Sequence, residues 1–225
     1  MKLSEEMKNK TLLSFELFPP KTEKGLQNLP GTIDHLMKYN PSYISCTYGA
    51  GGGNVGANRE VCQMIKNAGT TPVTHFTVIK NTKEGIKEQL DQYLADGVDH
   101  MLALRGDIPL GETTTCGDFD YATDLVKFVR DTYGDKFEIA VAGSPEGHIS
   151  CRSLESDIAV LKQKQDNGAD YIMTQLCWDM EQFKYWLDAI RKAGITMPVD
   201  VGVMPILDQA ATINMALSRN GCVMD

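Results

Sequence analysis

The feature that most limits the fold of this chain is a regular alternation of short apolar runs with longer amphipathic segments. Runs rich in β-branched and aromatic residues predict strands, whereas apolar residues that recur with a helical period predict helices. One strand and one helix together recur every roughly 27 to 38 residues, which is typical of the βα units of a parallel sheet. No proline- or serine-rich linker interrupts the pattern, so we predict one domain over residues 1–225. The predicted strands lie at 11–18, 43–48, 72–78, 99–105, 137–143, 170–175 and 199–204, and the predicted helices at 25–39, 55–68, 82–96, 119–133, 152–167, 180–193 and 208–219.

Polar residues at the ends of the predicted strands distinguish between two parallel-sheet folds. A doubly wound sheet places its site at one switch point, whereas a (β/α)8 TIM barrel gathers all its strand ends around one mouth. Polar residues end nearly every strand here, namely Glu16, Thr47, His75, Arg105 with Asp107, Ser144 with Glu146, and Gln175. We therefore predict a (β/α)8 TIM barrel, of which this sequence contains only seven βα units.

Composition and charge argue against several classes of function. The net charge of −8 is unfavourable for binding nucleic acid or an anionic membrane. Residues 1–10 are predicted to be a short polar lead-in, and no apolar run reaches the roughly 18 residues of a membrane span, so we expect a cytoplasmic protein. The six cysteines form no C-x-x-C pair, and the four histidines show no metal-ligand spacing, so no metal site is predicted.

The first predicted strand carries a single carboxylate, Glu16, and ends at Pro19 and Pro20. Side chains alternate along a strand, so Phe15 and Leu17 point to one face and Glu16 to the other. A carboxylate at the end of a buried strand is unfavourable unless it has a partner or a chemical role. We therefore expect Glu16 to have either a partner or a chemical role.

Three other features have a structural as well as a functional interpretation. The segment 51–56 matches G-x-G-x-x-G, but the residues roughly 20 positions on provide no carboxylate for a ribose, which favours a loop near a ligand over a dinucleotide site. Arg105-Gly106-Asp107 is either a turn with an ion pair or a binding loop at a barrel mouth. His75 alone would be a buried core histidine more often than a ligand.

Eight segments, taken in order, carry a resemblance to a known family. They are Ser14–Lys21, Cys46–Gly52, Pro72–Thr77, Ala103–Pro109, Asp120–Val126, Pro145–His148, Lys164 with Gly168–Ala169, and Thr174–Gln175. In this order and spacing they resemble methylenetetrahydrofolate reductase. The resemblance implies a (β/α)8 barrel and a flavin-dependent reduction of 5,10-methylenetetrahydrofolate to 5-methyltetrahydrofolate in one-carbon and methionine metabolism.

The resemblance also implies roles for individual residues. Glu16 falls at the position of the general acid, and Asp107 falls beside the flavin and the folate. The positions where the family contacts FAD are occupied by Thr47, Tyr48, Ala50, His75, Arg105, Gly106, Asp107, Tyr121, Ala122, His148, Asp157 and Lys164. The implied substrate contacts are Glu16, Asp107 and Gln175. NADH or NADPH is the implied electron donor, with a companion redox subunit in some members. We also expect a homo-oligomer, because seven strands leave an exposed edge that favours pairing.

The sequence departs from the family pattern in two ways. The eighth strand is absent, and Ser144, Val160 and Gln163 stand at positions where the family commonly has other residues. Two other interpretations of the chain follow. It is either a pterin-binding methyltransferase-like barrel, which needs no flavin, or a non-catalytic or partner-completed subunit, because a seven-stranded barrel leaves an open edge.

Overall fold

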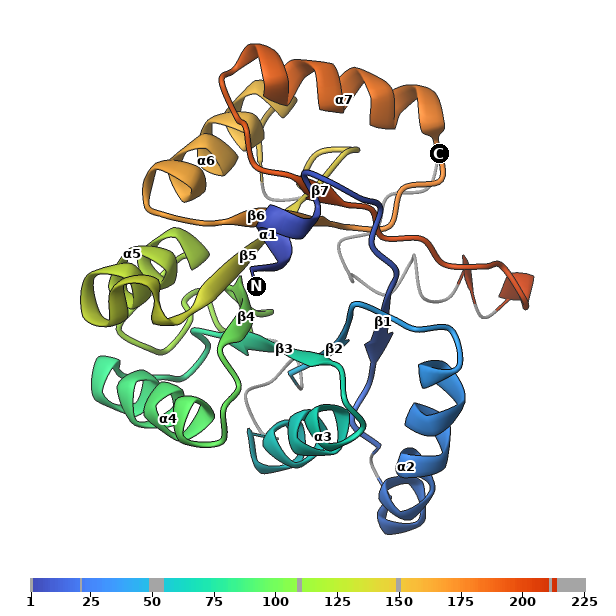
Figure 1. The fold of residues 1–225 in the computed structure, drawn as a ribbon. Coiled ribbons are helices and arrows are strands. Elements are labelled where there is room, and N and C mark those ends of the chain that lie inside the picture. Colours follow the sequence, from blue (N-terminus) through green and yellow to red (C-terminus); the bar gives the residue numbers. More distant parts are fainter. Residues whose placement is uncertain are drawn as a thin grey trace.

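The computed structural model describes residues 2–20, 22–48, 55–108, 111–148, 151–210 and 212–213 (Figure 1). Seven parallel strands form one sheet in the order β1-β2-β3-β4-β5-β6-β7. The strands are β1 (Ser14–Leu17), β2 (Tyr43–Cys46), β3 (Thr71–Thr77), β4 (His100–Leu104), β5 (Glu138–Gly143), β6 (Tyr171–Thr174) and β7 (Val199–Asp200). The helices are α1 (Leu3–Glu6), α2 (Glu23–Met37), α3 (Val55–Asn67), α4 (Lys83–Ala95), α5 (Ala122–Tyr133), the 3₁₀ helix η1 (Gly134–Lys136), α6 (Leu154–Asp166) and α7 (Met180–Lys192).

The sheet curls around a central axis, and α2 to α7 lie outside it, as Figure 1 shows. This arrangement confirms the prediction of a TIM-barrel type of fold with seven strands. The two outermost strands are shorter than predicted, because β1 pairs only with β2 and β7 only with β6 within the described residues. Of the helix predicted at 208–219, residues 209–210 and 212–213 are helical and Asp208 is not, while residues 211 and 214–219 lie outside the described part of the chain.

The alternation of side chains along the strands divides the apolar core in two. Ile44, Phe76 and Ile139 point outward and pack with the surrounding helices. The alternate strand residues point inward and, together with Leu3 of α1, form a second cluster, whose other buried members are Tyr43, Val73, Leu102, Ala140 and Tyr171. The barrel interior is therefore filled by side chains below its mouth, as in other barrels of this size.

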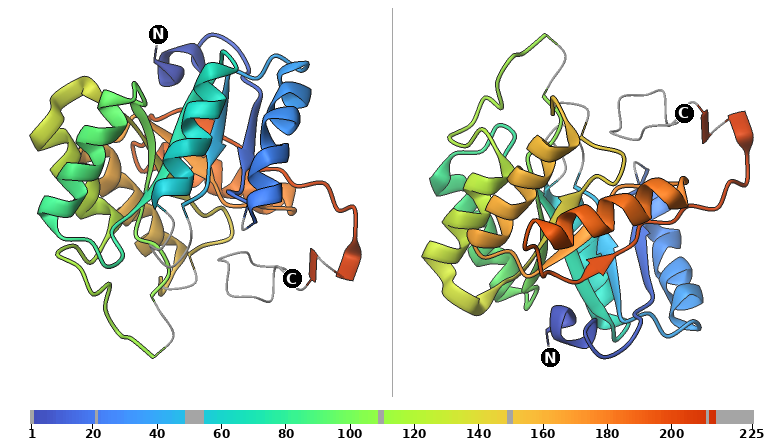
Figure 2. Two further views of the ribbon diagram at one scale, coloured as in Figure 1. Left: turned by 90° about the horizontal axis from the view of Figure 1, so that it is seen from below. Right: turned by 90° about the horizontal axis from the view of Figure 1, so that it is seen from above.

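The amino-terminal segment differs from the predicted polar lead-in. Residues Leu3–Glu6 form α1, which lies over the centre of the ring in Figure 1 and at the end opposite the long loops in Figure 2. Leu3 is buried against the interior cluster. The prediction missed this helix because α1 spans only four residues, too few to show a helical period.

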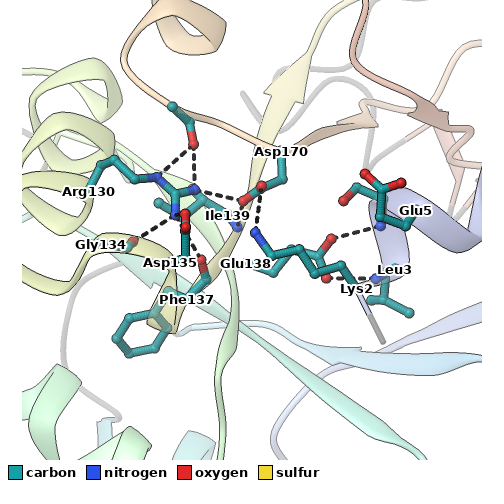
Figure 3. Close-up of polar contacts among 12 residues, drawn as sticks. Lys2, Leu3, Glu5, Arg130, Gly134, Asp135, Phe137, Glu138, Ile139 and Asp170 are labelled. Carbon is teal, nitrogen blue, oxygen red and sulfur yellow. Dashed lines mark hydrogen bonds and ion pairs between the residues drawn. The ribbon is translucent and has the colours of Figure 1, made fainter.

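A polar network fixes α1 to the amino-terminal end of the barrel, and Figure 3 shows the contacts of Glu138 with α1 and those of Asp170. The backbone N–H groups of Leu3 and Ser4 each donate to the Glu138 carboxylate at 2.7 Å. His100 Nε2 lies 2.9 Å from the same carboxylate. Beside it, Asp170 accepts from Arg130 at 2.8 Å and from the backbone of Ile139 at 2.8 Å. One end of the barrel is therefore closed, and the carboxyl ends of the strands remain for a site.

Candidate functional site at the carboxyl ends of the strands

Glu16 and His75 face each other near the carboxyl ends of β1 and β3. Glu16 Oε2 lies 3.8 Å from His75 Nε2, and 46% of the Glu16 side chain is exposed. Burial lowers the pKa of His75 to about 4, so the imidazole is neutral at neutral pH. Burial, followed by the negative charge of Asp200, raises the pKa of Glu16. The pair is therefore a neutral imidazole beside a carboxyl group that holds its proton more firmly than usual.

The surroundings of Glu16 differ from what its sequence neighbours indicate. Phe18, two residues further along the chain, does not enclose the carboxyl group, because it is 72% exposed. The groups that face Glu16 instead come from β3 and β7, which are distant in the sequence. The raised pKa of Glu16 is therefore a product of the barrel rather than of its own strand.

The loop after β4 carries Arg105, Gly106 and Asp107 and lies close against β3. Gly106 has a φ of +84°, and a Cβ atom there would lie 2.6 Å from Ile79 Cγ1 and 3.1 Å from Thr77 Cβ. Only glycine fits both the backbone conformation and the space. Arg105 Nε donates to the Gly106 carbonyl at 3.3 Å, and Asp107 is exposed at the mouth.

A second group of charged side chains gathers beside β5 and α6. Lys164 Nζ donates to the Ala142 carbonyl at 3.0 Å, and burial lowers the pKa of this lysine against the opposing charge of Asp157. Burial also lowers the pKa of His148, which is influenced by the charges of Asp157, Arg105 and Lys164. These four predicted residues are therefore near one another, with basic groups in excess.

Three predicted residues follow β2. The backbone N–H of Thr47 donates to the Leu17 carbonyl at 2.9 Å. Tyr48 is buried, and its hydroxyl donates to Gln89 Oε1 at 2.8 Å, so its side chain lies against α4. Burial raises the pKa of Tyr48 to about 12. Ala50 and the glycine-rich segment after it lie outside the described residues.

The remaining predicted residues are at the start of α5 and the end of β6. Tyr121 is the N-cap of α5 and is 62% exposed, whereas Ala122 next to it is buried. Gln175 follows β6 directly, and its backbone N–H donates to the Gly143 carbonyl at 2.8 Å. Its side-chain Oε1 accepts from the Leu176 backbone at 2.9 Å, which fixes the orientation of the amide.

Two buried polar atoms point to a ligand. Within the described part of the chain, His75 Nε2 and Thr77 Oγ1 have no hydrogen-bond partner. Buried polar groups are nearly always hydrogen-bonded, so these two atoms are expected to bind a ligand or an ordered water. Both belong to the carboxyl-terminal half of β3, beside Glu16 and under the Gly106 loop.

Sequence reasoning missed Asn58, which supports the β2 end of the site. This amide on α3 is fully buried, and its Nδ2 donates to the carbonyls of Cys46 at 3.0 Å and Thr47 at 3.1 Å. Its Oδ1 accepts from Thr74 Oγ1 at 2.8 Å and from Tyr93 Oη at 2.7 Å. The sequence signal that could have identified Asn58 is a polar residue at a position where an amphipathic helix is expected to be buried. Asp200, described below, was missed as well.

A sequence model of the family described as "Methylenetetrahydrofolate reductase" matches residues 2–219. The chain belongs to the methylenetetrahydrofolate reductase family. This confirms the resemblance seen in the sequence. Within the described residues, no helix is long and apolar enough to cross a membrane, and no group of three or more His, Cys, Asp or Glu could hold a metal ion.

Curated relatives from plants and bacteria match most of the chain. It is 38% identical over 219 residues to the protein named methylenetetrahydrofolate reductase (NADH) 1 of Arabidopsis thaliana, covering 92% of this chain and 37% of that relative. It is 34% identical over 202 residues to the 5,10-methylenetetrahydrofolate reductase of Salmonella typhimurium, covering 89% of this chain and 67% of that relative. The chain thus spans little more than a third of the plant protein.

Solved structures with low sequence identity share the fold. One is a protein from Clostridium thermocellum described as binding two copies of 5-methyl-5,6,7,8-tetrahydrofolic acid, with a TM-score of 0.64 and 14% identity over 90% of this chain and 69% of that one. Another is 2,3-dimethylmalate lyase, with a TM-score of 0.60 and 12% identity over 99% and 87% of the two chains. At these identities the likeness shows the fold alone.

Proposed function

We propose that this chain reduces 5,10-methylenetetrahydrofolate to 5-methyltetrahydrofolate, with FAD as hydride carrier and NADH or NADPH as electron donor. Family membership supports the reaction, and the name of the Arabidopsis relative supports NADH. The observation that carries the proposal is the Glu16 carboxyl group at the barrel mouth, with a raised pKa and a neutral histidine beside it. A raised pKa is the direction of shift that favours a proton donor near neutral pH.

The residues at the mouth fit a flavin nucleotide. His75 Nε2 and Thr77 Oγ1 are buried and unpartnered in the described residues, and Gly106 packs closely against Thr77 beside them. Arg105 and Lys164 would neutralise a pyrophosphate. The residues proposed to hold FAD are Thr47, Tyr48, Ala50, His75, Arg105, Gly106, Asp107, Tyr121, Ala122, His148, Asp157 and Lys164. When bound, FAD supplies the hydride that reduces the one-carbon unit.

Glu16 would deliver the proton that makes the substrate reducible. The bridging carbon of the substrate joins two nitrogens and accepts hydride poorly. A proton from Glu16 to one of these nitrogens opens the ring and leaves an iminium cation on the substrate, which accepts hydride readily. Positioned proton transfer of this kind contributes about 10²–10⁴-fold in rate.

Asp107 and Gln175 would orient and stabilise the folate. A carboxylate beside the iminium cation lowers the energy of the charged state, which is the role proposed for the exposed Asp107. The Gln175 amide can donate and accept side by side, as the edge of a pterin requires. Its held orientation at the end of β6 suits that role.

Glu16→Gln tests the proposal, because glutamine has a similar shape but carries no acidic proton. Reduction of bound FAD by NADH and its reoxidation by methylenetetrahydrofolate are measured separately under anaerobic conditions. We expect the first step to be unchanged and the second to fall by at least about 10²-fold. Glu60→Gln, on the exposed face of α3, is the matched control.

Two results would contradict the proposal. Folate-dependent reoxidation at the wild-type rate in Glu16→Gln would remove Glu16 as proton donor. A purified protein without flavin absorbance, unable to bind added FAD, would instead favour the pterin-binding methyltransferase.

A further inference from the structure

Asp200 is an acidic residue in the barrel interior, and it is not among the residues proposed to hold FAD or the folate. It is the second residue of β7 and pairs with Met173 of β6. Its neighbour Val199 packs into the outer apolar cluster. Because side chains alternate along a strand, Asp200 points to the inside of the barrel.

The Asp200 carboxylate reaches the first two strands. Its Oδ2 accepts a hydrogen bond from Tyr43 Oη on β2 at 2.5 Å and from Ser14 Oγ on β1 at 3.4 Å. Ser14 and Glu16 lie two residues apart on the same face of β1, about 7 Å along the strand. Asp200 therefore lies one layer of side chains below Glu16.

The described contacts of Asp200 bring hydroxyl groups and no positive charge. Burial raises the pKa of Asp200, while the hydrogen bonds from Tyr43 and Ser14 lower it. Burial and then the charge of Asp200 raise the pKa of Glu16. Two carboxyl groups so arranged titrate as a coupled pair, in which ionisation of one disfavours ionisation of the other.

Among the described residues, the other titratable groups near the two carboxylates supply no compensating cation. They are Tyr43 and Cys46 on β2, His75 on β3 and Tyr171 on β6. Burial lowers the pKa of His75 to about 4, and it raises the pKa of both tyrosines. The adjacent Cys62 thiol, together with burial, raises the pKa of Cys46. All four side chains are therefore uncharged near neutral pH.

We propose that Asp200 is a positioning residue for the proton donor, holding a fixed negative charge beneath Glu16 so that Glu16 carries its proton in the resting protein. The proposal rests on the function proposed above for Glu16. After Glu16 has given its proton to a substrate nitrogen, two negative charges face each other in the barrel. Glu16 then recovers a proton from solvent, which reaches its partly exposed side chain.

Two substitutions separate this electrostatic role from a merely structural one. Asp200→Asn removes the charge but keeps an oxygen that accepts from Tyr43 and Ser14. Asp200→Ala removes both the charge and the acceptor. A structural tie between β7 and the first strands would fail only in the alanine variant. Asp188→Asn, on the exposed face of α7, is the charge-matched control.

The direct measurement is a ¹³C NMR titration of the Glu16 carboxyl carbon, assigned by its loss in Glu16→Gln. We expect the pKa of Glu16 to fall in both Asp200 variants and to stay unchanged in Asp188→Asn. Because Asp200 ionises while Glu16 still holds its proton, the pKa of Asp200 should stay close to its wild-type value in Glu16→Gln, a variant that leaves Asp200 intact. An unchanged Glu16 titration in Asp200→Asn, or a change confined to Asp200→Ala, overturns the proposal.

The pH profile of folate-dependent flavin reoxidation gives the second measurement. Because Glu16 must be protonated, the rate falls as pH rises through its pKa, and Asp200→Asn should move this fall to lower pH while leaving the low-pH rate unchanged. An equal loss of rate at every pH contradicts the proposal. The titration needs no folate, so a wild-type protein that shows the coupling but no folate reduction refutes the proposed function alone.

Discussion

Replacing Glu138 with glutamine should weaken the attachment of α1 to the closed end of the barrel. Glu138 is the first residue of β5 and is 3% exposed. Its carboxylate accepts from the backbone of Leu3 and Ser4 and pairs with His100. Glutamine keeps one acceptor oxygen but replaces the other with a donor and loses the charge. One backbone N–H of α1 would then lose its partner.

The size of the effect follows from the titration of Glu138. His100 and the hydrogen bonds from Ser4 and Leu3 overcome the effect of burial and lower the pKa of Glu138 from 4.5 to about 2. At about 1.4 kcal/mol per pKa unit, the folded protein stabilises the ionised form by about 3 kcal/mol. This stabilisation is fully present above pH 4.5 and is lost as pH falls through about 2.

The partner histidine has the opposite dependence on pH. Burial alone would lower its pKa, but Asp99 and Glu138 raise the pKa of His100 to about 9. The contribution of His100 is therefore present below its ordinary pKa of 6.5 and lost as pH rises through about 9. Both shifts include the same ion pair, so the two contributions are not added.

Urea unfolding between pH 2 and pH 7 measures the prediction. We expect Glu138→Gln to lower the free energy of unfolding at pH 7 by up to about 3 kcal/mol. The difference from wild type should shrink as pH falls from 4.5 toward 2. Glu88→Gln, on the exposed side of α4, should change the free energy of unfolding by less than about 0.5 kcal/mol. A difference between wild type and Glu138→Gln that does not vary with pH would refute the reasoning.

Two further substitutions concern the loop after β4. Gly106→Ala should lower the free energy of unfolding by more than about 1 kcal/mol, because the new Cβ meets Ile79 at 2.6 Å. Gly69→Ala is the control, because Gly69 has a similar φ of +95° and its new Cβ would meet no described atom within 4 Å. An equal loss of unfolding free energy in both variants would rule out the contact with Ile79 as the cause. Asp107→Asn should weaken folate binding and slow flavin reoxidation by folate, measured by titration and stopped flow. Wild-type affinity and rate would exclude Asp107 from the site.

The sequence predicted those parts of the barrel that depend on local pattern. Glu16 and His75 could be placed at the mouth because strand ends and side-chain alternation are encoded in a few consecutive residues. The orientation of Tyr48 could not be predicted, because its hydroxyl binds Gln89 on α4. Asn58 went unrecognised for a related reason, since its partners come from β2, β3 and α4.

The contacts that cross the barrel also could not be predicted from local sequence patterns. Asp200 interacts with Ser14, which lies 186 positions away in the chain, and Leu3 interacts with Glu138, 135 positions away. A local sequence pattern does not predict a contact between residues so far apart in the chain. The electrostatic surroundings of Glu16 therefore had to come from the structure, even though Glu16 itself stood out in the sequence.

The attachment of α1 to Glu138 has a consequence for how its sequence can vary. The donors are the main-chain N–H groups of Leu3 and Ser4, which every amino acid except proline provides. Substitutions at these two positions can therefore preserve the hydrogen bonds to Glu138, although the burial of Leu3 and Ser4 limits which side chains fit. Proline is the residue that selection should exclude there, and the acidic residue at the start of β5 is the half of the contact that must keep its identity.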